Sequence, residues 1–180
     1  MNLLRIPSLC LLALAAACTP LYFTQPQPAD APALEAFPED LLGVYDDRQD
    51  GGRVRVAPGQ AVLVMRDPET GTVEEEVYAL SDSVVLKAIG TKYLFSLRAE
   101  QGWVVLLLEP RRRGRLLLRG MNALQDRDIH LAKAVMRVDS AELDGSQYYF
   151  ADPSRAELDA FLRRGGFSQQ QADLRRAKER

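Results

Sequence analysis

The sequence predicts a single α+β domain, an antiparallel β-meander of about eight strands with barrel-like or sandwich-like curvature and a C-terminal helix. Two observations support this fold class. Between residues 41 and 120, short apolar runs alternate with residues that favour turns. Beyond residue 120 the pattern changes, and the clearest helical pattern follows residue 153.

Eight apolar runs in the central region are expected to be strands. Turn formers such as Pro58-Gly59 and Gly90-Thr91 separate them, and connections this short make consecutive strands antiparallel neighbours. Residues 104–108 are apolar at every position, which indicates a strand covered on both faces. The predicted strands are 42–45, 53–56, 61–66, 72–80, 84–89, 92–97, 103–109 and 115–119.

The region after residue 120 mixes helix and strand signals. Asp128 can cap a short helix, although the apolar pattern that follows is ambiguous between helix and strand, and residues 147–151 are expected to form a strand. Ser154 and Glu157 have the spacing of a capping box that starts the main helix.

This main helix has an apolar stripe, with Leu158 and Phe161 among its residues, and Gly165-Gly166 ends it. Capping-box spacing recurs at Ser168 and Gln171. We therefore expect a frayed surface helix in the polar tail that follows.

The N-terminus has the features of a secretion signal. Arg5 precedes an apolar run, and small residues at 15–17 precede Cys18. A retained transmembrane helix is the alternative, but the apolar core spans roughly a dozen residues where spanning needs about 20. Residues 1–17 are therefore predicted to be a signal peptide that is removed.

Leu14-Ala15-Ala16-Ala17-Cys18 resembles the lipobox of bacterial lipoproteins, although the usual Leu three residues before the Cys is replaced here by Ala15. The resemblance implies that Cys18 carries acyl chains such as palmitate, which anchor the protein to a membrane. Thr19 stands where Asp signals retention at the inner membrane, and no acidic run follows. The resemblance therefore implies the periplasmic face of the cell outer membrane.

Residues 18–38 are predicted to be a lipidated Cys followed by a Pro-rich tether, because five prolines favour extended geometry. Leu21, Tyr22 and Phe23 interrupt it and are interpreted as residues of the lipid interface or of the linker. A β-rich domain is expected over 39–151, and a helical segment that packs on it over 152–180.

Charge and cysteine content exclude several classes of protein. The chain has 180 residues, with 23 basic and 25 acidic side chains, and only one basic residue lies in the predicted signal peptide. This balance does not favour nucleic-acid binding. Cys10 leaves with the signal peptide and Cys18 carries lipid, so burial and hydrogen bonds must hold the fold.

The sequence contains no recognisable catalytic or metal-binding set. His130 is the single histidine and is expected to be an ordinary surface or half-buried residue. Asp46, Asp47 and Asp50 resemble a calcium loop but fail at two ligand positions. Glu75 and Glu109 are the pair to check for glycosidase chemistry, although Glu75 is more simply an edge-strand charge. We expect no catalytic residue, metal or cofactor, and no enzyme.

One turn concentrates positive charge, with Arg111, Arg112, Arg113 and Arg115 between two very apolar strands. These guanidinium groups could bind an anionic partner, such as lipid or sugar phosphates. The alternative is that the hairpin tip needs charge to stay soluble.

The function hypothesis is therefore a membrane-anchored, non-catalytic envelope lipoprotein that binds a protein or another envelope component. Its contact with the membrane is through the lipid anchor. The alternative is a carrier that holds a small apolar ligand inside a curled meander.

Overall fold

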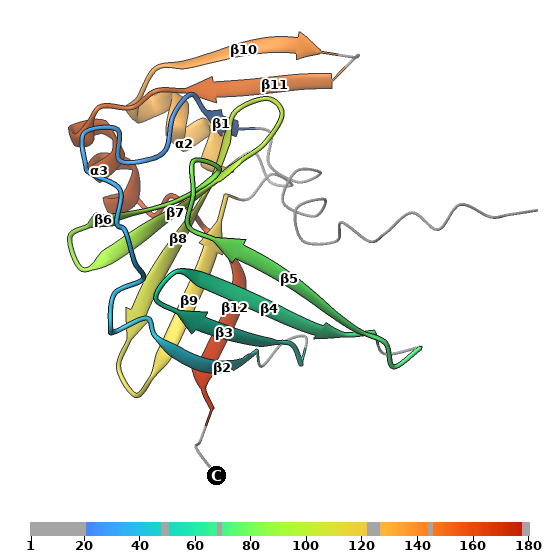
Figure 1. The fold of residues 1–180 in the computed structure, drawn as a ribbon. Helices are drawn as coiled ribbons and strands as arrows, with labels where there is room; N and C mark the ends of the chain where they lie inside the picture. The colour runs from blue at the N-terminus through green and yellow to red at the C-terminus, as the bar shows by residue number, and fades with distance from the viewer. Residues whose placement is uncertain (1–20, 48–50, 68–69, 122–126, 144–145, 178–180) are drawn as a thin grey trace, which may run out of the picture.

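The computed structural model describes residues 21–47, 51–67, 70–121, 127–143 and 146–177. Strands dominate these ranges, and their labels follow Figure 1. The strands are β1 (Leu21–Phe23), β2 (Gly43–Asp47), β3 (Arg53–Ala57), β4 (Gln60–Arg66), β5 (Val73–Ala79), β6 (Val84–Ile89), β7 (Lys92–Arg98), β8 (Trp103–Arg111), β9 (Arg115–Gly120), β10 (Val138–Leu143), β11 (Ser146–Ala151) and β12 (Gln169–Arg176). The helices are α2 (Arg127–Val135) and α3 (Arg155–Arg163).

The strands form one mixed sheet in the order β10-β11-β1-β8-β9-β12-β2-β3-β4-β5, with β7 and then β6 branching from β8. All eight predicted central strands are confirmed, with ends that agree within two residues. The prediction of one eight-stranded meander was wrong, because β2–β5 and β6–β9 form two separate meanders that β12 joins by pairing with β9 and β2. The sheet has twelve strands in the described ranges and is not closed.

The tether was predicted wrongly from Leu21 onward. Leu21, Tyr22 and Phe23 are at most 1% exposed and form β1, which pairs in parallel with β11 and at one position with β8. The chain then crosses the sheet, where the ammonium of Lys87 donates to the carbonyl of Pro28 at 2.9 Å. Residues of the expected tether are therefore part of the domain core.

The C-terminal region contains one confirmed helix and one wrong prediction. The α3 helix has the predicted capping box between Ser154 and Glu157. Gln169–Arg176, expected to be helical, is strand β12, with Ala172 and Leu174 buried between two other strands. The tail is polar because its alternate residues face solvent.

Two apolar clusters occupy the two faces of the sheet. On one face, α2 and α3 pack against alternate residues of β8, including Val105 and Leu107. The intervening residues, including Leu106 and Leu108, belong to the second cluster with Phe37. This confirms that the apolar strand is covered on both faces. No helix within the described ranges is long and apolar enough to cross a membrane.

Candidate functional site

The predicted arginine cluster lies at the turn that connects β8 to β9. Arg113 and Gly114 both have left-handed backbone conformations, with φ of 64° and 66°. Glycine adopts this conformation freely, but for a residue with a Cβ it costs about 1–2 kcal/mol. The turn therefore holds a strained arginine at its tip.

Strand register extends this cluster beyond the turn. Arg111 of β8 is directly opposite Arg115 of β9, which is directly opposite Arg175 of β12. Like charges in directly opposite positions destabilise a sheet, so this row opposes folding. Arg111, Arg112, Arg113, Arg115, Leu117 and Arg175 line an open hollow of about 580 Å³.

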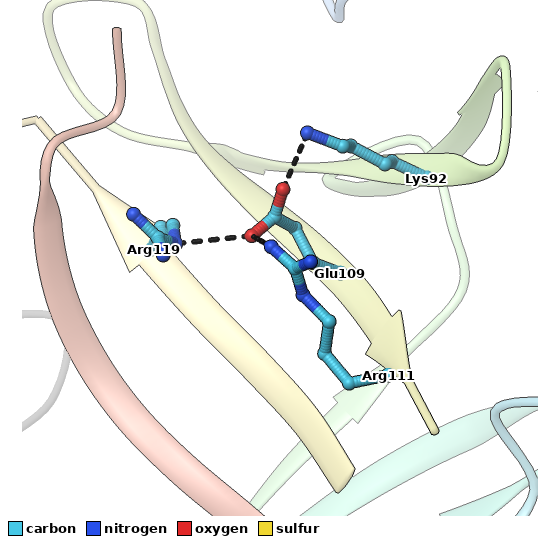
Figure 2. A network of polar contacts seen from close by, with 4 residues as sticks. All are labelled: Lys92, Glu109, Arg111 and Arg119. Carbon is cyan, nitrogen blue, oxygen red and sulfur yellow. Dashed lines mark hydrogen bonds and ion pairs between the residues drawn. The ribbon is translucent and has the colours of Figure 1, made fainter. Parts of the chain in front are cut away.

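Glu109 lies behind the hollow on the same face of β8, and its side chain is only 5% exposed. Figure 2 shows the three cationic side chains that converge on it. Arg111 donates a hydrogen bond to Oε2 at 2.8 Å, and Lys92 forms an ion pair with Oε1. The Nε of Arg119 lies 3.0 Å from Oε2, but not in hydrogen-bonding geometry.

The charge state of Glu109 follows from these contacts. Burial alone would raise its pKa, but hydrogen bonds from Lys92 and Arg111, together with their charges, outweigh burial and hold the pKa below its ordinary value. Glu109 is therefore ionised at neutral pH. Its one negative charge is shared among three cations.

Asp173 of β12 provides a second anchor. Arg115 donates to its two carboxylate oxygens, from Nε at 3.1 Å and from Nη2 at 2.7 Å. A bidentate contact of this kind fixes the plane of the guanidinium group. The two carboxylates thus hold arginines of the hollow in place.

We define the arginine surface as the seven cationic side chains gathered on this part of the sheet: Lys92, Arg111, Arg112, Arg113, Arg115, Arg119 and Arg175. Glu109 and Asp173 form ion pairs with it, and Asp46 of β2 lies directly opposite Arg175. Seven cations and three carboxylates leave an excess of four positive charges, although the whole chain has a net charge of −2. Within the described residues, Arg112, Arg113 and Arg175 are exposed and have no ion pair. They are therefore available to a ligand.

The structure brings the four predicted arginines together and adds three cations that the sequence analysis missed. Alternation along β9 places Arg119 on the same face as Arg115, so that signal was present in the sequence. Arg175 was missed because its segment was expected to be helical. Cys18, the predicted lipidation site, lies outside the described residues.

The other candidate residues do not form a site. Glu75 pairs with Arg55 at 2.9 Å on β5, which is an edge strand, as its charge predicted. It is separated from Glu109 by β9, β12, β2, β3 and β4 in the sheet order, so the two carboxylates are not neighbours in the sheet. His130 is exposed on α2.

In the suggested calcium loop, Asp46 is paired with Arg53 at 2.8 Å, and Asp50 lies outside the described residues. Over the ranges that the structure describes, no group of three or more His, Cys, Asp or Glu side chains could hold a metal ion.

Comparison of the chain with known proteins identified no relative. No protein-family model, curated protein or solved structure matches it significantly.

Proposed function

We propose that the protein is a non-catalytic, lipid-anchored module of a bacterial envelope that binds an anionic partner through the arginine surface. The observation that carries the proposal is the excess of four positive charges in the arginine surface, five of whose arginines line an open hollow. The chemistry required of the partner is several negative charges close together, as in clustered carboxylates or phosphates.

Solubility alone is a poor explanation for this surface. A hairpin tip that only needs to stay hydrated requires charges at its tip, whereas here the cations continue onto β7, β8, β9 and β12. Opposed arginines and a strained Arg113 both oppose folding. Features that cost stability and cluster in one place are typical of binding sites.

The anchor in this proposal rests on the sequence features at Cys18. The resemblance to a lipobox supports lipidation, and Thr19 supports the outer membrane, with the domain on the periplasmic face. Replacing Cys18 with Ser is expected to abolish lipid labelling. Labelling that persists in this variant would overturn the anchor.

The binding site is tested on an unlipidated domain that begins at Thr19. Calorimetric titration at low salt with an acidic hexaglutamate peptide and with inorganic pyrophosphate provides two anionic probes. We expect at least one to bind, and binding to weaken as salt screens the contact. Binding by neither probe would overturn the proposed site.

A double variant then locates the contact. Arg112→Gln with Arg113→Gln removes two charges that have no ion pair among the described residues, so folding should be nearly unchanged. Affinity should fall about tenfold, as expected for the loss of roughly 1.4 kcal/mol. Arg163→Gln with Arg164→Gln is the matched control, because these adjacent exposed arginines lie at the end of α3. Equal losses in both pairs would contradict a localised site.

A further inference from the structure

The chain offers almost no tether between the expected lipid and the folded domain. Two residues, Thr19 and Pro20, separate Cys18 from Leu21, and Leu21 is fully buried in β1. An extended chain spans at most about 3.6 Å per residue, so Cys18 lies within about 11 Å of Leu21. A lipid on Cys18 therefore brings the bilayer close to β1.

The neighbours of β1 determine which surface can meet a bilayer at that distance. The two strands that pair with β1 in the described structure are β8 and β11. From Trp103 to Glu109, β8 is buried at every position, so it cannot face lipid. In β11, Ser146 and Gln147 are exposed, and Tyr148, Tyr149 and Phe150 are half-buried.

The distances along β11 match the reach of the anchor. Leu21 is directly beside Tyr149, and Ser146 lies three residues before Tyr149 in β11. At about 3.3 Å per residue, Ser146 lies about 10 Å along β11 from Tyr149, the residue beside Leu21. The start of β11 therefore extends about as far from Leu21 as Cys18 can reach. Figure 1 shows β10 and β11 as a two-stranded arm along one side of the body.

Aromatic side chains gather on both faces of this arm. The ring of Tyr22 lies 6.0 Å from that of Tyr148 and 6.2 Å from that of Phe150. On the other face, the ammonium of Lys133 lies 4.3 Å from the centre of the Tyr149 ring. Amphipathic aromatic rings with adjacent cations are enriched at the headgroup level of membranes.

Resting on the lipid anchor of the proposed function, we propose that the arm formed by β10 and β11 is seated on the bilayer, with its aromatic residues at the headgroup level. The occupant of this surface is the membrane that holds the acyl chains. Asp139 and Glu142 of β10 are exposed, so the contact depends on the aromatic rings and the short chain rather than on attraction to anionic lipids.

The arginine surface lies away from this contact. Trp103 pairs with Phe23, and Arg111 is eight residues further along β8, a distance of about 26 Å at 3.3 Å per residue. In Figure 1 the turn between β8 and β9 lies at the opposite end of the body from β10 and β11. With the arm on the bilayer, the arginine surface faces away from the membrane and remains accessible to a partner.

The test uses the processed, lipidated protein in vesicles of phosphatidylethanolamine and phosphatidylglycerol that carry nitroxide labels on their headgroups. Lipidation occupies Cys18 and processing removes Cys10, so an introduced cysteine is the one thiol available for a fluorophore. Ser146→Cys places it at the start of β11, and Arg112→Cys places it on the arginine surface. We expect strong quenching at position 146 and weak quenching at position 112.

The outcomes separate the anchor from the seating. Mass spectrometry of the N-terminal peptide first establishes whether Cys18 carries lipid, and its absence overturns the anchor and the seating together. Lipid on Cys18 with equal quenching at both positions, or stronger quenching at position 112, overturns the seating alone. Gln147→Cys repeats the measurement at a second exposed residue of β11 and must agree with Ser146→Cys.

Discussion

Glu109 shows how one carboxylate organises a strongly cationic surface. Lys92, Arg111 and Arg119 converge on it, and without its charge they would face one another unneutralised. These cationic side chains are 32% to 50% exposed, so they can turn toward water when the carboxylate is lost. Loss of Glu109 should therefore cost the free energy of hydrogen bonds to a charged group, which is smaller than the cost of breaking a fully buried ion pair.

Replacing Glu109 with Gln should lower the free energy of unfolding by about 1–3 kcal/mol near pH 7. Because the pKa of Glu109 is lowered in the folded state, its contribution is complete above the unfolded pKa of about 4.3 and is lost as pH falls through the folded pKa. Urea unfolding near pH 7 and near pH 3 measures this, and the difference in unfolding free energy between the two proteins should be smaller near pH 3.

Glu75→Gln is the matched control for this prediction. Glu75 also pairs with an arginine, but its side chain is 53% exposed, so its loss should cost less than about 1 kcal/mol. A stability difference between wild type and Glu109→Gln that persists unchanged in acid would show that the carboxylate is not ionised in the folded protein.

Phe161 is one of two buried residues, with Leu158, through which α3 contacts the core. It is 0% exposed, and its ring lies 5.5 Å from that of Phe167 in an edge-to-face arrangement. Phe161→Ala should destabilise the domain by about 3–5 kcal/mol, because truncation of a buried Phe leaves a cavity. Thermal unfolding measures the loss. Val77→Ala, at a side chain that is 55% exposed, should stay within about 0.5 kcal/mol, and similar losses in both variants would mean that α3 is not docked.

At the level of elements, the short strand β1 depends on a glycine in the segment that precedes β8. A Cβ at Gly102 would lie 2.9 Å from the carbonyl oxygen of Phe23 and 3.1 Å from Cβ of Tyr22. Gly102→Ala should therefore push β1 from β8 and cost about 1–3 kcal/mol. Hydrogen exchange should show faster exchange in β1 and β11.

Gly59→Ala provides the comparison, because nothing lies within 4 Å of a Cβ there. That variant should be neutral or slightly stabilising, by up to about 1 kcal/mol, since alanine restricts the unfolded chain. Equal destabilisation of the two variants would contradict close packing between β1 and Gly102.

Sequence patterns predicted those elements whose partners are close along the chain. The central strands and α3 have local signals, namely turns, alternation and a capping box, and these proved sufficient. β1 has three residues beside a run of prolines, and only its long-range pairing with β11 makes it a strand. β12 has the composition of a polar helix, but the unpaired edges of β9 and β2 determine its conformation.

The candidate site was predictable to the same extent. Four arginines occur within five residues around the turn between β8 and β9 and were visible as a cluster, whereas Arg175 and Lys92 reach the same surface through strand pairing. The burial of Glu109 depends on three strands that a local pattern does not align.

For the whole molecule, β12 joins the two meanders. Truncation after Gly166 removes β12 and the buried side chains of Phe167, Ala172 and Leu174. It also leaves the ladders to β9 and β2 unmade, so we expect loss of the cooperative thermal transition. Circular dichroism checks this. Truncation after Ala177 removes only residues beyond β12 and should leave the transition in place; a cooperative transition in both would show that the meanders do not need β12.

The pairing of the two ends of the chain also determines when folding can finish. Gln25 donates a hydrogen bond to Asp152, 127 residues later, and Arg176 donates one to the hydroxyl of Tyr45, 131 residues earlier. The hairpins of the two meanders close over short separations and can form first, whereas these contacts bear the entropy of closing long loops. Synthesis proceeds from the N-terminus, so β1 and β2 appear early, whereas β11 and β12, which pair with them, appear last. The sheet is therefore completed only when the C-terminal strands are available, and until then the open edges of β1, β9 and β2 are exposed to aggregation or to a holding chaperone.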